Sequence, residues 1–372
     1  MHPNQLPFAA HLFQGHWFAR NKERIQLTLD EVDFIVATLG HRPKKWDGNC
    51  QTDIDAMQRV LDSNPKVLDR IGSRLLGLVL GFPGGGPAVK LLIDKGMVLN
   101  FDPWEFNELH DAAHGGAVDS VRVLFESGMC DARTVSVQKP HTGWPSNLSL
   151  LYWAAWGGYP EFASLCLQYG AAEYLELQIE GNGERGSTVL QESVAPSHWS
   201  EDNYRTAGKR KTTHIFLEAG AEYDIFSACA RNDVDRLNSI LSTDSEAASR
   251  ADSFGSTPLH WAVRANSEEC VKELLRNDVP LDVMNRSKRT AIQWGAERDS
   301  AESIRLLARA GADLNTQDGK GRSPLHRATY EGKVDAAEAL IECGANVSLT
   351  NKKGKTAFEI ARKEARHFKD QV

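Results

Sequence analysis

Polar and apolar positions return along the C-terminal part of the chain with a period of 33 residues. Thr257-Pro258-Leu259-His260 is followed by Thr290-Ala291-Ile292-Gln293, Ser323-Pro324-Leu325-His326 and Thr356-Ala357-Phe358-Glu359. A Thr or Ser side chain caps a helix by accepting a hydrogen bond from its first turn, and Pro suits the first helical position, where no N–H is needed. The pattern therefore predicts one helix after each Thr or Ser.

Small residues stand three positions after the first apolar residue of each copy, and we expect them to let neighbouring first helices approach closely. They are Ala262, Gly295, Ala328 and Ala361. A second apolar block, around Leu274, Leu307 and Leu340, predicts a second helix in each copy. Gly311 and Gly344 follow it and suit the left-handed residue that ends a helix. Each period is thus predicted to be a helical hairpin, and such hairpins stack as a solenoid.

This arrangement resembles the ankyrin repeat, whose pattern Thr-Pro-Leu-His-x-Ala-Ala followed by Leu-Leu-x-x-Gly-Ala is readable here almost letter for letter. Divergent copies continue toward the N-terminus at less even offsets. Their first helices are expected after Asp224, Thr188, Ser149, Asn107 and Arg74, with residues 90–96 as the second helix of the Arg74 copy. A still earlier hairpin is expected from residues 29–39 and 54–61.

The predicted fold class is all-α, an ankyrin-repeat α-solenoid of about nine helical-hairpin repeats with inserted loops in the N-terminal two thirds. We expect a single solenoid over residues 31–372, with divergent repeats and insertions in 31–223 and with regular repeats and a C-terminal cap in 224–372. Residues 1–30 form an N-terminal segment whose structure the sequence does not indicate. Insertions in a repeat array tend to decorate a working surface.

The resemblance implies a concave face lined by the fingers between hairpins and by the ends of the first helices, and partners usually bind there. Projecting the chain onto this face gives an aromatic N-terminal zone and a basic C-terminal zone. The predicted binding residues are Phe82, Trp104, Phe106, His114, Trp144, Trp156, Arg231, Arg264, Arg298 and Tyr330. Exposed aromatic residues favour a binding role, because they bury much area at little entropic cost. Trp153, Trp261 and Trp294, next to the consensus His position, are expected in the core instead.

The charged residues are also unevenly distributed, with a larger share of basic residues in the C-terminal part of the chain. The net charge is −7, yet residues 252–372 hold 20 Lys/Arg and 18 Asp/Glu, leaving 23 and 32 for residues 1–251. The predicted fingers of the C-terminal repeats carry the basic residues Arg286, Lys288, Arg289, Lys320, Arg322, Lys352, Lys353 and Lys355. These residues favour a protein partner with an acidic stretch. Nucleic acid is disfavoured by the overall acidity and by aromatic residues that stand away from the basic fingers.

One segment is similar to a catalytic motif. His110-Asp111-Ala112-Ala113-His114 places two imidazoles one helical turn apart, as in the HExxH zinc hydrolases, but Asp stands where that motif has its general base. His110 also fills the consensus repeat position, as His260 and His326 do. We therefore expect no metal, no cofactor and no catalytic residue, although the sequence does not show whether His110, Asp111, His114 and His141 converge.

Two functions remain open. The first is a non-catalytic protein-interaction scaffold that holds a partner segment on its concave face. The alternative is an ankyrin-fold enzyme or small-molecule binder with a pocket lined by His and Trp in the N-terminal groove. Six cysteines without paired spacing, four of them in predicted helices, and the lack of a signal-peptide pattern favour a cytoplasmic, intracellular protein. The glycines and prolines within residues 75–93 argue against a membrane span, and the oligomeric state is not indicated.

Overall fold

The computed structural model of the chain describes residues 27–39, 52–97, 112–113, 116–133, 135–136, 148–177, 188–194 and 203–362. The chain folds into two compact units. One comprises Met1–Leu177 with Asp202–Gly220, and the other comprises Gln178–Glu201 with Ala221–Val372. None of the described helices is long and apolar enough to cross a membrane.

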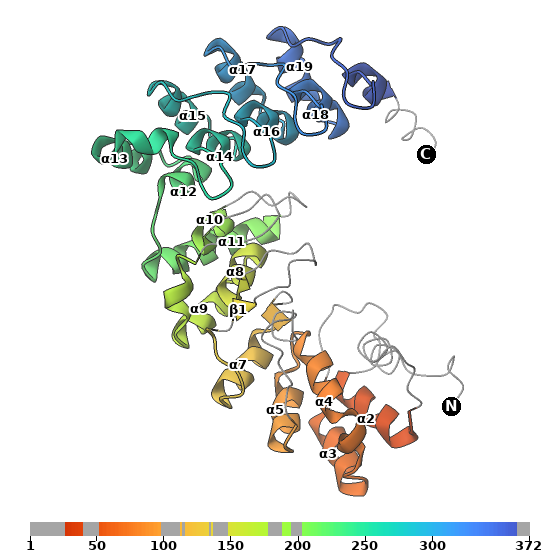
Figure 1. The fold of residues 1–372 in the computed structure, drawn as a ribbon. Coiled ribbons are helices and arrows are strands. Elements are labelled where there is room, and N and C mark those ends of the chain that lie inside the picture. Colours follow the sequence, from red (N-terminus) through yellow and green to blue (C-terminus); the bar gives the residue numbers. More distant parts are fainter. Residues whose placement is uncertain are drawn as a thin grey trace. The chain divides into compact units, whose positions relative to one another are not determined.

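The N-terminal unit is built from antiparallel helical hairpins (Figure 1). Its elements are α2 (Leu29–Leu39), α3 (Ile54–Ser63), α4 (Val67–Leu80), α5 (Gly86–Asp94), α7 (Val118–Glu126), β1 (Val135–Ser136), β2 (Leu148–Ser149), α8 (Leu150–Gly157), α9 (Pro160–Gln168), η2 (Ala171–Tyr174) and α11 (Asn203–Glu218). Helix α2 packs on α3 and α4, α5 packs on α4 and α7, and α11 covers α8 and α9. The two short strands pair antiparallel, with Val135 opposite Ser149.

Sequence predictions for this unit are only partly right. Helices lie where the earliest hairpin was expected, in α2 and α3, and Ser149 caps α8 by accepting from the Tyr152 N–H at 3.2 Å. The prediction that a helix begins after Arg74 is wrong, because α4 already begins at Val67. Buried Leu68, Ile71 and Leu75 continue its apolar stripe across Arg74 with helical spacing, so nothing ends the helix there.

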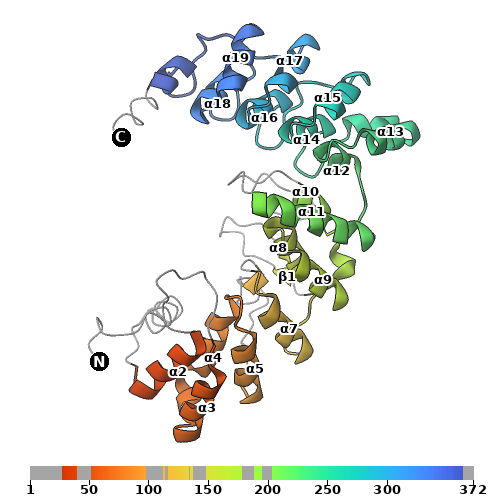
Figure 2. The ribbon, with the colours of Figure 1, turned by 180° about the vertical axis from the view of Figure 1, so that it is seen from behind.

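The C-terminal unit alternates inner and outer helices. The inner helices are α10 (Val189–Val194), α12 (Ile225–Ala230), α14 (Pro258–Arg264), α16 (Ala291–Arg298) and α18 (Pro324–Tyr330). The outer helices are α13 (Val234–Thr243), α15 (Glu268–Leu275), α17 (Ala301–Arg309) and α19 (Val334–Glu342), and η3 (Ser245–Ser249) follows α13. Both views show α14, α16 and α18 as one row and α15, α17 and α19 as a second (Figures 1 and 2). The expected caps Asp224, Thr257, Thr290 and Ser323 each precede an inner helix.

The fingers between an outer helix and the next inner helix share one turn. Its first residue is Asp252, Asn285, Asp318 or Asn351, and each Asp or Asn side chain accepts hydrogen bonds from the N–H groups two and four residues later. The residue at the fourth position of this turn has a positive φ in all four fingers. It is Gly255, Lys288, Gly321 or Gly354, at φ 72°, 55°, 73° and 67°. Three fingers have glycine at this position. The fourth has Lys288, which adopts a backbone conformation that residues with a Cβ disfavour.

A hydrogen bond links each of the inner helices α14, α16 and α18 to the finger that follows it. Nε2 of His260 lies 3.1 Å from the Arg289 carbonyl oxygen, Nε2 of Gln293 donates to that of Arg322 at 3.1 Å, and Nε2 of His326 lies 2.9 Å from that of Lys355. The other end of the same side chain accepts from the cap residue's N–H, which completes a capping box. We call these contacts the forward bonds. Because Nδ1 of His260 accepts from the Thr257 N–H, the ring is neutral and its Nε2 carries the proton.

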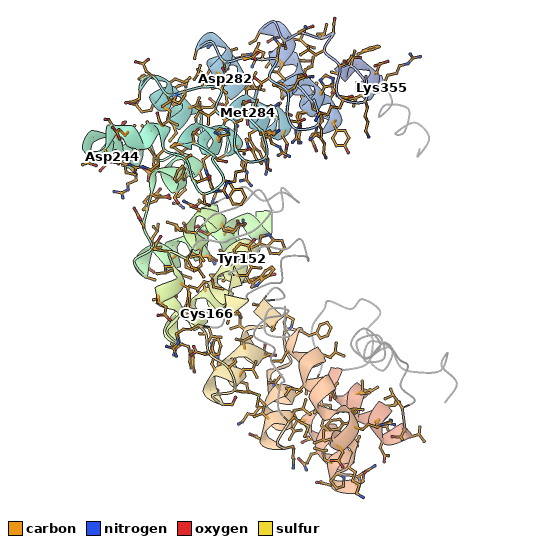
Figure 3. The ribbon with its side chains drawn as sticks, in the orientation of Figure 1. Tyr152, Cys166, Asp244, Asp282, Met284 and Lys355 are labelled. Carbon is orange, nitrogen blue, oxygen red and sulfur yellow. The ribbon has the colours of Figure 1, made fainter. Side chains whose placement is uncertain are left out.

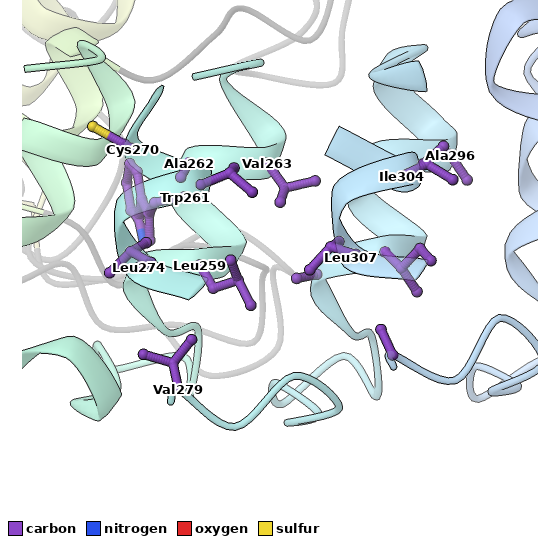
Figure 4. Packing of buried hydrophobic residues seen from close by; sticks show 14 of the residues in the cluster. Leu259, Trp261, Ala262, Val263, Cys270, Leu274, Val279, Ala296, Ile304 and Leu307 are labelled. Carbon is purple, nitrogen blue, oxygen red and sulfur yellow. The ribbon is translucent and has the colours of Figure 1, made fainter. Parts of the chain in front are cut away.

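The core lies between consecutive hairpins (Figure 4). A Cβ at Gly295 would lie 3.0 Å from Cγ1 of Val263 on α14 and 3.2 Å from Cγ1 of Ile304, so the expected close approach of inner helices is confirmed. Trp153, Trp261 and Trp294 are buried, as predicted. Cys166 on α9, Cys229 on α12 and Cys270 on α15 are buried, unpaired by disulfides, and pack as apolar side chains. Gly311 and Gly344 have φ of 96° and 94° after their outer helices, which confirms the predicted left-handed ends.

Replacing His260 with Gln tests the forward bond. Burial lowers the pKa of His260 from 6.5 to about 4, although its backbone hydrogen bonds oppose this shift. Between these values the unfolded chain binds a proton that the folded chain refuses, so the stability contribution present above pH 6.5 is lost as the pH falls toward 4. Gln preserves both contacts, as Gln293 shows one repeat later. Urea titrations should find the parent losing about 3 kcal/mol more than His260→Gln from pH 7 to pH 4. Identical pH profiles would contradict this assignment.

Lys288→Gly should stabilise the chain by about 0.5–1 kcal/mol, because glycine adopts a positive φ without the steric cost of a Cβ. Gly255→Ala is the matched control, since its Cβ would meet only ordinary contacts beyond 3.4 Å and should cost about 1 kcal/mol. Gly321→Ala should cost more, because its Cβ would lie 2.8 Å from the Lys352 nitrogen. Thermal unfolding of the three variants checks this order. A lower melting temperature for Lys288→Gly would count against backbone strain at that finger.

Candidate binding face of the C-terminal repeats

Two positions of each of α14, α16 and α18, and one position of each of the fingers before α16 and α18, lie together on one side of the C-terminal unit. The helix positions are the fourth and seventh after the cap, and the finger position directly precedes the next cap. We call this surface the inner face. It comprises Trp261, Arg264, Arg289, Trp294, Glu297, Arg322, Arg327 and Tyr330, with the finger residues Asp252 and Asp318 beneath them.

Guanidinium groups stack on the buried tryptophans of this face. The Arg264 guanidinium lies 5.9 Å from the Trp261 ring centre and 4.9 Å from that of Trp294. The Arg289 guanidinium lies 4.9 Å from the same Trp294 ring. Contacts of this kind stabilise by about 0.5–2 kcal/mol, depending on how well water is excluded. Trp261 is fixed further by its indole N–H, which donates to Oδ2 of Asp252 at 2.8 Å.

An ion-pair network continues from these rings to α18. Oε2 of Glu297 lies 3.2 Å from Nη1 of Arg289 and 2.9 Å from Nη1 of Arg327. Oδ2 of Asp318 lies 2.8 Å from both Nε and Nη2 of Arg322 and 3.4 Å from Nε of Arg327. These ion pairs between side chains therefore add a second connection between two inner helices and two fingers.

Burial shifts the pKa of groups at both ends of the inner face. Burial raises the pKa of Asp252 above its ordinary value, although hydrogen bonds from Trp261 and two backbone N–H groups oppose it. Burial also lowers the pKa of Arg327, and the positive charges of Arg289 and Arg322 lower it further. Asp318 behaves oppositely. Burial would raise its pKa, but hydrogen bonds from the backbone N–H groups of Arg322 and Lys320 keep that pKa below its ordinary value.

Comparison with protein-family models matches residues 225–318 to ankyrin repeats (3 copies) and residues 306–361 to ankyrin repeats (many copies). The chain carries ankyrin repeats. Together the matches run from the start of α12 through α19 to the helix that begins at residue 357. A search of curated proteins found no match to the chain. The count of about nine repeats, and the placement of repeats before residue 225, stay predictions.

Four predicted binding residues lie in the ankyrin repeats. Arg264 lies on the inner face between two tryptophan rings, and Tyr330 ends α18 with 57% of its surface exposed. Arg231 is exposed after α12, where its guanidinium lies 6.0 Å from the Tyr223 ring centre. Arg298 is half-buried at the end of α16.

The predicted aromatic zone is only partly described. Phe82 is half-buried in the turn between α4 and α5. Trp156 is half-buried on α8, and its ring meets that of Trp153 edge-on at 6.0 Å. Trp104, Phe106, His114 and Trp144 lie outside the described residues, as do His110, Asp111 and His141. Within the described ranges no three potential metal ligands come together.

Sequence reasoning placed Glu297 on the concave face but did not choose it as a binding residue, and it missed Asp318 and Arg327. It also took Arg289 and Arg322 for basic finger residues of the open surface, whereas both are largely buried and ion-paired. The repeat period could have indicated Arg327, because this residue stands 33 residues after Trp294 and 66 after Trp261 and is therefore equivalent to both. Other finger residues are exposed as expected, among them Lys320 and Lys355, and Met284 lies exposed on the finger before α16 (Figure 3).

Glu297→Gln tests the network. It leaves the charges of Arg289 and Arg327 without their shared carboxylate, so it should destabilise the chain by about 2–4 kcal/mol. Glu302→Gln is the matched control, because Glu302 lies at the surface, 4.0 Å from Arg305 and 3.8 Å from Arg309, and should cost at most about 0.5 kcal/mol. Urea unfolding compares the two. Equal losses would mean that the network does not stabilise the repeats.

Proposed function

We propose that the chain is a non-catalytic protein-interaction scaffold whose ankyrin repeats bind a segment of another protein along the inner face. Ankyrin repeats generally mediate protein–protein interaction, and stacked repeats present extended surfaces for it. The observation that carries the proposal is the composition of this face, where Trp, Arg and Tyr side chains stand in register on three successive inner helices.

The inner face has its large side chains in place before a partner arrives. Stacking holds Arg264 and Arg289 against Trp294, and Glu297 holds Arg289 and Arg327 from the other side. A partner therefore loses little conformational entropy in ordering them. Tyr330 is exposed beside this row, and an exposed Tyr next to fixed Arg and Trp side chains is the composition typical of binding hot spots.

We further propose that the bound segment is acidic. The finger residues Arg286, Lys288, Lys320, Lys352, Lys353 and Lys355 are exposed. Exposed rim charges steer an oppositely charged partner more than they hold it, so they should act on the association rate. Phe82 and Trp156 are proposed as apolar contact points of the N-terminal unit, and Trp104, Phe106, His114 and Trp144 stay predictions there.

Paired variants test the scaffold. A partner captured by the full chain from native lysate is identified, and its binding segment is then titrated as a purified peptide. Tyr330→Ala should weaken binding by about 2 kcal/mol if Tyr330 is a hot spot. Ile341→Ala is the control, because Ile341 is similarly exposed, at 53%, on outer helix α19. Equal affinities for Tyr330→Ala and the parent would exclude the inner face as the recognition surface.

Charge reversal provides the second arm. Lys320→Glu should slow association several-fold at low salt and flatten its salt dependence, while the dissociation rate changes little. Arg276→Glu reverses another exposed charge, at the end of outer helix α15, and should leave both rates near those of the parent.

A further inference from the structure

Side chains that are buried between earlier repeats are exposed at the C-terminal end of the ankyrin array. The second residue of an inner helix is buried in three successive repeats, where Leu259, Ile292 and Leu325 are 1%, 1% and 3% exposed. Phe358 has the same place on the helix that begins at residue 357, and it is 72% exposed. A position built for packing between repeats therefore carries a large aromatic side chain at the surface.

Outer helix α19 shows the same change along one stripe. Val271 of α15 and Ile304 of α17 are fully buried, whereas the equivalent Ala337 of α19 is half-buried. One turn further along α19, Ile341 is 53% exposed. Residues three or four apart share one face of a helix, so this stripe marks the side of α19 that corresponds to the packed side of earlier outer helices.

The finger after α19 completes this surface. Val347 is 52% exposed, whereas Leu314, its equivalent one period earlier, is 9% exposed. We call the exposed apolar residues at this end of the unit the end face. They are Val334, Ile341, Val347 and Phe358. Repeats normally bury such a surface against a neighbour, and apolar side chains gathered on an exposed surface mark an interaction site.

Opposite charges accompany the end face on two different rows of the unit. Glu338 is exposed on α19, which belongs to the row of outer helices (Figures 1 and 2). Lys353 is exposed on the finger. Its equivalents Phe254 and Lys320 each accept a hydrogen bond from an N–H of the next finger, so Lys353 stands at the edge where a further finger would pack. The surface thus has an acidic part, an apolar part and a basic part.

We propose that the end face packs against the end face of a second copy of this chain about a two-fold axis. In such a contact each surface meets itself, so residues on one side of the axis meet those on the other side in the partner. With the axis through the apolar residues, Lys353 of each copy lies against Glu338 of the other. The pairing of a basic finger with an acidic helix is what favours a second copy as the occupant.

The contact uses none of the residues that make up the inner face. It is therefore independent of the proposed scaffold function, and either can fail without the other. Two copies joined in this way would present two inner faces, so that a ligand carrying two binding segments could engage both and gain affinity.

Sedimentation equilibrium of the full chain tests the dimer. We expect a dissociation constant in about the micromolar range, since a small contact gives a weak dimer. Phe358→Asp should weaken the dimer at least roughly tenfold, because it brings a carboxylate into an apolar contact. Met284→Asp is the matched control, since Met284 is 47% exposed on the finger before α16, and it should change the dissociation constant less than about twofold.

A charge exchange tests the two-fold arrangement. Glu338→Lys and Lys353→Glu should each weaken the dimer several-fold, because like charges then meet across the contact. The double variant should restore the dissociation constant of the parent, because every pair regains opposite signs. A double variant that is as weak as the single ones would overturn the two-fold arrangement.

Three other results would overturn the proposal. The first is a parent chain that stays monomeric at roughly a hundred micromolar. The second is a Phe358→Asp variant that dimerises as well as the parent. The third is a Phe358→Asp variant whose melting temperature falls at concentrations where the parent is monomeric, which would show that Phe358 is covered within its own chain.

Discussion

The forward bond is the contact on which the C-terminal unit depends. One side chain, the third residue of an inner helix, satisfies the N–H of its own cap residue and a carbonyl of the next finger at once. Those groups would otherwise be buried without partners, which backbone groups rarely tolerate. His and Gln both have an acceptor and a donor at the required separation, and so they alternate along the array at positions 260, 293 and 326.

The same bond positions the inner face. The carbonyls it holds belong to Arg289, Arg322 and Lys355, so the backbone of each basic finger residue is tied to the preceding repeat. Their side chains then extend over the next inner helix, where Arg289 reaches Trp294 and Glu297. Stability and surface chemistry are thus linked, because the side chain that completes the capping box also fixes the backbone position of the basic finger residue in the next repeat.

The period of 33 residues was enough to predict caps, left-handed helix ends and core tryptophans in the C-terminal unit, because each depends on local chemistry that recurs in every repeat. It did not predict where α4 begins, because a continuous apolar stripe extends the helix N-terminally past Arg74 to Val67. Nor did it predict the Glu297 and Asp318 network, since a period shows which positions are equivalent but not which side chains reach across repeats. The histidine segment and most of the aromatic zone lie outside the described residues.

The change from tryptophan to arginine along one row has a consequence for how a bound segment is aligned. The backbone of these repeats is periodic, and a uniform face would let an extended ligand slip by one repeat into an equivalent position. Here the row reads Trp261, Trp294, Arg327, and the row beside it reads Arg264, Glu297, Tyr330. No shift by one repeat maps either row onto itself. A segment lying along this face would therefore have one alignment that matches apolar to apolar and charge to charge.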